Sequence, residues 1–189
     1  MKRRSKKRYF LLLFILVIGL LFVKSDWMGR WMYPIRYMED IRASASNYNI
    51  DPHLVAAIIR AETNFSTGAE SAKGALGLMQ IMPETADWIM EKAGFTGITK
   101  EMLRHRADVS IELGSWYLGS LHKQFNGNSV AVVAAYNAGP GNVSKWLNNG
   151  QWDGKLENIS QVPFGETRHY VQRVFYYYNK YKDFYPKFE

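Results

Sequence analysis

Apolar residues recur every three or four positions through most of this chain, which is the spacing of amphipathic helices. Asp51 and Pro52 suit the N-cap and first position of one such helix, and Asp108 is expected to cap another. No segment of the domain alternates with period two, so the sequence predicts an all-α domain. The predicted helices lie from about residue 34, over 52–63, over 83–92, after 99, over 108–126, over 129–136 and from 166 onward.

Glycine, proline and small residues separate the predicted helices. Residues 64–77 hold three glycines, three alanines and two serines, which predicts a close-packed loop. No Gly-Lys-Ser or Gly-Lys-Thr follows it, so it is not a phosphate-binding loop. Residues 137–142 are expected to form a loop whose Pro140 begins the next helix, and 150–165 to be irregular.

The N-terminus has the pattern of an export signal. Six basic residues precede an apolar run of fifteen at 9–23. The run is short of the roughly 20 residues that span a bilayer comfortably, and no small-residue cleavage site follows it. We expect an uncleaved signal anchor at 9–23 that attaches the protein to the membrane, with secretion after cleavage as the alternative. Residues 1–8 would then stay cytoplasmic, 24–33 form a linker, and a domain at 34–189 lie outside the membrane.

Composition excludes several functional classes. The net charge of +7 comes from the N-terminus, because residues 25–189 contain 17 basic and 17 acidic side chains. A nucleic-acid-binding domain would need a basic face, so no nucleic-acid partner is expected. There is no cysteine, no His-Glu-x-x-His pattern and no Gly-x-Ser-x-Gly elbow, so we expect neither a metal nor a cofactor.

Glu62 is the strongest candidate for chemistry. It follows Val55, Ile58 and Ile59 at helical spacings, so its neighbours on the helix surface are apolar. It also lies at the C-terminal end of its helix, where the dipole disfavours a negative charge. Both effects raise the pKa of a carboxyl group, as general-acid catalysis of glycoside cleavage requires. A solvated surface glutamate is the simpler interpretation of the same residue taken alone.

Other polar and aromatic residues border the glycine-rich segment. Gln80 can hydrogen-bond acetamido or hydroxyl groups, and Met82 can pack adaptably against rings. Tyr136 and Asn137 precede Gly139, and the tyrosine hydroxyl is expected to point toward Glu62 and orient it. The structural alternatives are a tight inter-helix connection and a capped turn with a packed ring.

Four sequence motifs relate these candidate residues to a known protein family. They are AET at 61–63, GLMQIMPETA at 77–86, AYNAGPG at 135–141 and ETRHYV at 166–171. In this order they resemble the catalytic domain of soluble lytic transglycosylases, which is related to goose-type lysozyme. The resemblance implies an all-α, lysozyme-like domain with a substrate groove, here preceded by one N-terminal hydrophobic helix. Thr63 departs from the family's usual serine but keeps a hydroxyl.

The same resemblance assigns roles to residues. It implies that Glu62 is the sole catalytic acid and base. The implied substrate-binding residues are Ser71, Gln80, Met82, Tyr117, Tyr136, Asn137 and Glu166. Ser71 would help to place a muramyl N-acetyl group.

The implied reaction cleaves the β-1,4 bond between N-acetylmuramic acid and N-acetylglucosamine in peptidoglycan strands without water, and leaves a 1,6-anhydro end. Other carboxylates have structural interpretations, because Glu84 and Asp87 lie in a first helical turn, Asp108 is a predicted cap and Glu166 opens a helix. A hydrolytic muramidase of the goose-lysozyme type and a non-catalytic peptidoglycan-binding domain stay open as alternatives. The sequence indicates no oligomeric state.

Overall fold

The computed structural model describes residues 2–23 and 26–188, and its regular elements in these ranges are helices. Two isolated bridges, Glu70 with Leu76 and Leu76 with Ile81, tie the glycine-rich loop together without making a strand. The predicted all-α class is therefore confirmed for the described residues. The helices are α1 (Lys2–Val23), α2 (Asp26–Met32), α3 (Met38–Tyr48), α4 (Pro52–Thr63), α5 (Pro83–Ala93), α6 (Lys100–His105), α7 (Ala107–Gln124), α8 (Ser129–Ala138), α9 (Pro140–Asn148), the 3₁₀ helix η1 (Ile159–Gln161) and α10 (Gly165–Phe184).

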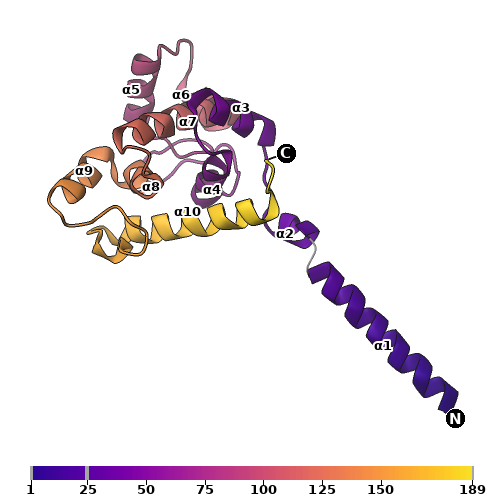
Figure 1. Ribbon diagram of the computed structural model, residues 1–189. Helices are drawn as coiled ribbons and strands as arrows, with labels where there is room; N and C mark the ends of the chain where they lie inside the picture. The colour runs from indigo at the N-terminus through magenta and orange to yellow at the C-terminus, as the bar shows by residue number, and fades with distance from the viewer. Residues whose placement is uncertain (1, 24–25, 189) are drawn as a thin grey trace.

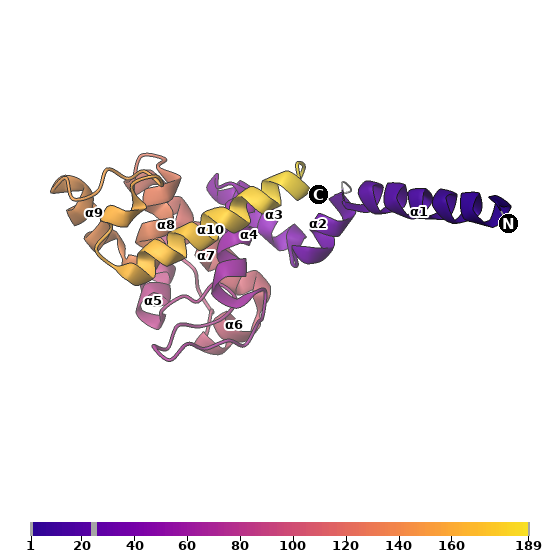
Figure 2. The same cartoon turned by 90° about the horizontal axis from the view of Figure 1, so that it is seen from below.

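The body of the molecule is built around α4, α7, α8 and α10. The long helix α10 packs along α4 and α8, while α3 packs on α7 and α4 (Figure 1). On the other side of the core, α5 and α6 pack against α7 (Figure 2). The loop between α4 and α5 reaches the start of α10, where Lys73 pairs with Glu166. One buried apolar cluster runs through these helices, and it includes Ile58 and Ile59 of α4.

Helix α4 begins and ends where the sequence predicts. The Asp51 carboxylate accepts a hydrogen bond from the backbone N–H of His53, and Pro52 occupies the first turn. Asn64 follows the helix in the left-handed conformation, with φ 53°, and ends it. Since both ends are fixed by local residues, the side chain at position 62 lies in the last turn of the helix.

Two predicted helix boundaries were wrong. Helix α7 begins at Ala107 with Arg106 at the N-cap position, so Asp108 is not the cap. Its carboxylate instead accepts hydrogen bonds from the Arg106 guanidinium, at 3.1 Å for Nε, and lies in the first turn where the dipole favours it. Residues 137–142 are not a loop, because α8 continues to Ala138 and α9 starts at Pro140, with only Gly139 between them.

Most of the predicted linker at 24–33 is helical, since residues 26–32 form α2, while residues 24 and 25 lie outside the described residues. The Arg30 side chain donates a hydrogen bond to the Phe184 carbonyl at 2.9 Å and stacks over the Tyr185 ring. Tyr33 stacks on the Phe184 ring at 5.7 Å. These contacts hold the segment against the C-terminal end of α10.

The N-terminal helix α1 extends away from this body (Figure 1). Within the described residues, no helix is both long and apolar enough to cross a membrane. The structure therefore does not support the transmembrane segment predicted at 9–23. The reason lies in the sequence, because α1 includes the basic residues near its start and its uncharged apolar run is only fifteen residues long. Of the predicted cytoplasmic segment 1–8, residue 1 lies outside the described residues.

Candidate active site

A cleft of about 350 Å³ opens between the C-terminal end of α4, the glycine-rich loop, the end of α8 and the start of α10. Seven of the eight predicted site residues meet in it. The cleft is lined by Glu62, Ser71, Ala72, Lys73, Ala75, Gln80, Met82, Tyr136, Asn137 and Glu166. We call this space the Glu62 cleft.

The eighth predicted residue, Tyr117, lines an adjoining chamber of about 220 Å³. This chamber shares Gln80, Met82, Tyr136 and Asn137 with the Glu62 cleft. The Tyr117 and Tyr136 rings lie 5.5 Å apart, so Tyr136 forms the boundary between the two spaces. Together they make one groove with an aromatic wall and a single glutamate from α4.

The surroundings of the Glu62 carboxyl favour its protonated form. Burial disfavours its charged form and is the largest effect, and it raises the pKa of Glu62 from 4.5 to about 7. The Tyr170 hydroxyl and the Arg173 guanidinium act against burial and lower this pKa, and the negative charge of Glu166 adds a smaller upward contribution, so that about 7 is the balance of these effects. The carboxyl can therefore give up a proton near neutral pH and can also take one back.

Tyr170 is a site residue that the sequence reasoning missed. Its hydroxyl is buried beside Glu62 and lowers the pKa of that carboxyl. Burial and the nearby Glu62 charge raise the pKa of this phenol well above its usual value. Tyr170 belongs to the 166–171 motif and follows Glu166 by one helical turn, which was the available signal, but its apolar neighbours on α10 suggested a core position.

Hydrogen bonds fix the loop to the end of α4. The Thr63 hydroxyl donates to the Leu78 carbonyl at 2.8 Å, which explains why a hydroxyl at this position suffices. The Tyr136 hydroxyl donates to the Met79 carbonyl at 2.8 Å. A backbone acceptor in the loop therefore takes its proton. Burial and the nearby Glu62 charge raise the pKa of Tyr136 well above its usual value, so the phenol lies beside Glu62 while it positions the loop that carries Gln80.

The loop itself depends on unusual backbone geometry. Gln80 adopts φ 50°, in the left-handed region, and its side-chain amide donates to the Gly77 carbonyl at 2.9 Å. Gly77 has φ 72°, and a Cβ there would lie 2.1 Å from the Leu103 carbonyl oxygen of α6. The Ser71 oxygen accepts a hydrogen bond from the backbone N–H of Ala75 at 3.0 Å. Its own proton stays available to a ligand in the cleft.

The opposite wall comes from α8 and α10. The side-chain amide oxygen (Oδ1) of Asn137 accepts a hydrogen bond from the Thr167 hydroxyl at 2.7 Å. This bond fixes the orientation of the side-chain amide and leaves its N–H₂ group free for a ligand. Glu166 is largely exposed and pairs with Lys73 of the loop at 3.4 Å, across the opening of the cleft. Such an exposed pair contributes at most about 1 kcal/mol and can open easily.

Among residues 2–23 and 26–188, no cluster of His, Cys, Asp and Glu could hold a metal ion. The chemistry that the cleft itself offers is proton transfer by Glu62, with hydrogen-bonding groups and aromatic rings placed around it.

This combination of a helical body, a groove and one neutral glutamate defines a lysozyme-like class of protein. A family model described as the transglycosylase SLT domain matches residues 39–159, which is more than half of the chain. The chain therefore belongs to the transglycosylase SLT domain family.

Two related proteins of known name support this family assignment. The soluble lytic murein transglycosylase of Escherichia coli (strain K12) is 34% identical over 155 residues, which cover 80% of this chain and 24% of the relative. Membrane-bound lytic murein transglycosylase C of Actinobacillus pleuropneumoniae is 27% identical over 160 residues, which cover 74% of this chain and 44% of that protein. The chain thus spans about a quarter of the length of the first of these relatives and less than half of the second.

Solved structures share the fold. The 70 kDa soluble lytic transglycosylase of Escherichia coli superimposes with a TM-score of 0.77 at 32% identity, over 82% of this chain and 25% of that one. An inactive mutant of the lytic transglycosylase Slt from Pseudomonas aeruginosa gives a TM-score of 0.73 at 39% identity, over 80% of this chain and 24% of that one. The helical body described above is thus a lytic transglycosylase fold.

Proposed function

We propose that this chain is a peptidoglycan lytic transglycosylase that cleaves the β-1,4 bond between N-acetylmuramic acid and N-acetylglucosamine without water. The observation that carries the proposal is the neutral Glu62 carboxyl in the cleft, with its pKa raised to about 7 by burial. Family membership supports the reaction type, because the named relatives are lytic murein transglycosylases. The catalytic unit in this proposal is the domain over residues 34–189.

In the proposed first step, Glu62 donates its proton to the glycosidic oxygen, and the bond between that oxygen and C1 of the muramyl unit breaks. The 2-acetamido oxygen of the same sugar shields the positive charge that develops at C1, as in substrate-assisted glycosidases. In the second step the Glu62 carboxylate removes the proton from the muramyl C6 hydroxyl. The C6 oxygen then attacks C1 and closes the 1,6-anhydro ring, so Glu62 ends protonated and no water is consumed.

The remaining proposed roles are in binding. The free proton of Ser71 and the amide groups of Gln80 and Asn137 would hydrogen-bond acetamido and hydroxyl groups of the two sugars. Met82, Tyr117 and Tyr136 offer apolar surface to the sugar rings. Glu166 would contact the sugar or peptide side of the strand where the cleft opens.

A hydrolytic muramidase is the second candidate, and Glu166 is the observation that favours it. Its carboxylate lines the same cleft and could activate a water molecule, as the second carboxylate of inverting enzymes does. However, Glu166 is largely exposed and paired with Lys73, whereas the proposed lyase reaction needs Glu62 alone. We therefore favour the lyase.

Mass analysis of products from purified peptidoglycan tests this choice. The lyase leaves muramyl ends that are one water lighter than hydrolytic ends. Glu62→Gln should lose nearly all activity, since general acid–base catalysis contributes about 10²- to 10⁴-fold. Glu166→Gln should keep the anhydro product. Hydrated ends from the unaltered protein, or loss of turnover in Glu166→Gln as well as in Glu62→Gln, would favour the muramidase.

A small-molecule probe tests the cleft separately. The Escherichia coli 70 kDa relative has been solved as a complex with bulgecin A. We propose that bulgecin A also binds the Glu62 cleft of this chain and competes with glycan strands. Calorimetric titration of the Glu62→Gln protein, with and without glycan, would measure this competition. Independent binding of the two ligands would contradict it.

We further propose that the domain works outside the cytoplasmic membrane. The basic and apolar N-terminal segment supports export, and the names of the relatives include both soluble and membrane-bound lytic murein transglycosylases. Fractionation of cells that make the full chain tests this location, and washing the membranes with salt and detergent shows how the segment attaches. Recovery of the full chain in the cytosol would contradict the proposal.

A further inference from the structure

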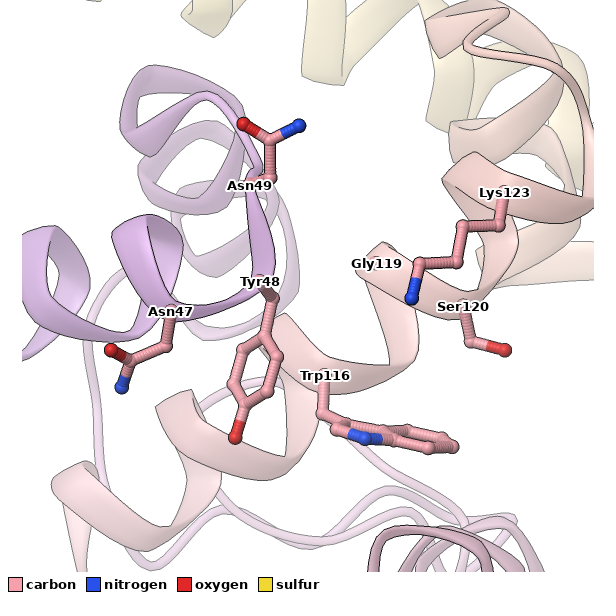
Figure 3. A pocket seen from close by; sticks show the side chains of 7 residues that line it. All are labelled: Asn47, Tyr48, Asn49, Trp116, Gly119, Ser120 and Lys123. Atoms are coloured by element: carbon pink, nitrogen blue, oxygen red, sulfur yellow. The ribbon is translucent and has the colours of Figure 1, made fainter.

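A second pocket lies outside the Glu62 cleft, between the C-terminal end of α3 and the second half of α7. Its volume is about 260 Å³. Figure 3 shows Tyr48 and Asn49 on one side and Trp116, Ser120 and Lys123 on the other, with the Lys123 ammonium directed toward the space between them. The two helices approach closely here, because a Cβ at Gly119 would lie 3.2 Å from Tyr48. We call this space the α3–α7 pocket.

The polar side chains around the α3–α7 pocket have unused hydrogen-bonding capacity. Within the described part of the chain, no hydrogen bond involves the side chains of Asn47, Asn49, Ser120 or Lys123, although all four line the pocket. The Trp116 indole lies among them as a partly exposed ring. An aromatic ring surrounded by amide, hydroxyl and ammonium groups is the chemistry that binds sugars, whose rings have apolar faces and hydroxyl edges.

An aromatic path connects this pocket to the Glu62 cleft. From Tyr117, which lines the chamber beside the cleft, the ring of Trp88 is 6.1 Å away. From Trp88 the ring of Trp116 is 5.6 Å away, and Trp116 lines the α3–α7 pocket. Trp88 is 41% exposed, so it presents apolar surface between the two sites instead of filling the core. The partly exposed Trp88 ring therefore lies between the ring that lines the chamber and the ring that lines the α3–α7 pocket.

The charges around the α3–α7 pocket indicate which kind of sugar it could bind. None of the described lining residues of the α3–α7 pocket carries a carboxylate, and Lys123 brings a positive charge to its rim. A peptidoglycan strand carries acetamido groups on every sugar and a carboxylate on each peptide-free muramyl unit. The amides of Asn47 and Asn49 match the first groups, and the Lys123 ammonium matches the second.

We propose that the α3–α7 pocket is a distal saccharide site that binds N-acetylated sugars of the same strand whose scissile bond lies at Glu62. The inference rests on the proposed function, since it takes the strand in the Glu62 cleft to be peptidoglycan. The site extends the groove beyond the reacting bond, and it makes the protein bind long strands more tightly than short ones. Internal bonds of long strands become the preferred substrates.

Binding measurements in a Glu62→Gln background test the distal site without turnover. Isothermal titration would compare a short peptide-free muramyl tetrasaccharide with long peptide-free glycan strands. Ser120→Ala with Lys123→Met removes two polar contacts from the surface, and Trp116→Leu removes the ring. We expect each variant to bind long strands about two- to tenfold more weakly, the range of one aromatic contact, and to bind the tetrasaccharide as the parent does.

A matched control is Lys155→Met, which removes an exposed lysine of the 150–165 segment and should change neither affinity. The proposal is overturned if the variants bind long strands as well as the Glu62→Gln parent, or if both strand lengths lose affinity equally. Thermal melting identifies a Trp116→Leu protein that fails to fold, and the surface double variant then decides. Failure of the proposed reaction would appear separately, in the products of the unaltered protein.

Discussion

Replacing Glu62 by Gln should make the protein more stable at alkaline pH while removing its activity. The side chain is nearly isosteric, so the packing at the end of α4 should be kept. Glutamine, however, never has to carry a negative charge in the cleft. Burial raises the pKa of Glu62 from 4.5 to about 7, so the folded state holds a proton that the unfolded state has released between these two values. Stability of the parent must therefore fall as pH rises through this window.

The size of the effect follows from the same shift. Each pKa unit corresponds to about 1.4 kcal/mol, so a shift from 4.5 to about 7 gives an upper value of about 3–4 kcal/mol. Because the cleft is open to water, which screens the charge, we expect the stability difference between the two proteins to be about 2 kcal/mol. At pH 4.5 the two proteins should have nearly equal free energies of unfolding, and above pH 7 the Glu62→Gln variant should be more stable by this amount.

Urea unfolding of both proteins between pH 4.5 and 8.5 measures the difference directly. Glu84→Gln is the matched control for removing a carboxyl group, because Glu84 is exposed in the first turn of α5. A difference between parent and Glu62→Gln that is constant across the whole range would refute the neutral carboxyl. So would a variant that becomes less stable than the parent as pH rises.

Three further substitutions test the surroundings of the cleft. Thr63→Val removes the hydrogen bond to the Leu78 carbonyl and should cost about 1–2 kcal/mol of unfolding free energy in urea melts, with Thr63→Ser close to the parent. Tyr170→Phe removes a hydroxyl that lowers the Glu62 pKa, so the alkaline limb of the pH–rate profile should move to higher pH; a shift to lower pH would contradict the geometry. Gly77→Ala places a Cβ against a backbone carbonyl of α6 in a left-handed conformation and should cost more than about 1 kcal/mol, visible as a lower Tm and lower activity.

The helices were largely predictable from the sequence because local signals mark their ends. Asp51 and Pro52 start α4, Pro83 starts α5, and each position has the conformation that its residue favours. The predicted cap at Asp108 failed because a neighbouring arginine offered the carboxylate a stronger partner than the backbone. Such competition depends on side-chain geometry, which the spacing of apolar residues does not contain.

The grouping of the candidate site residues in one groove was predictable from the motifs, but their contacts were not. The four motifs contain most of the candidate residues that line the cleft, because the motifs lie in the glycine-rich loop and at the helix ends around the cleft. The hydrogen bond of Tyr136 to the Met79 carbonyl was not foreseen, since a backbone acceptor has no signature in a sequence. Tyr170 was missed for a different reason. A buried phenol beside a buried acid looks like any other core position on an amphipathic helix.

The account depends most on Glu62 acting alone, as acid and then as base. Mass spectrometry of muramyl ends released from purified peptidoglycan, by the unaltered protein and by Glu62→Gln side by side, tests this most directly. We predict anhydro ends from the first and almost no release from the second. Hydrated ends, or release by Glu62→Gln at a rate near that of the unaltered protein, would contradict it.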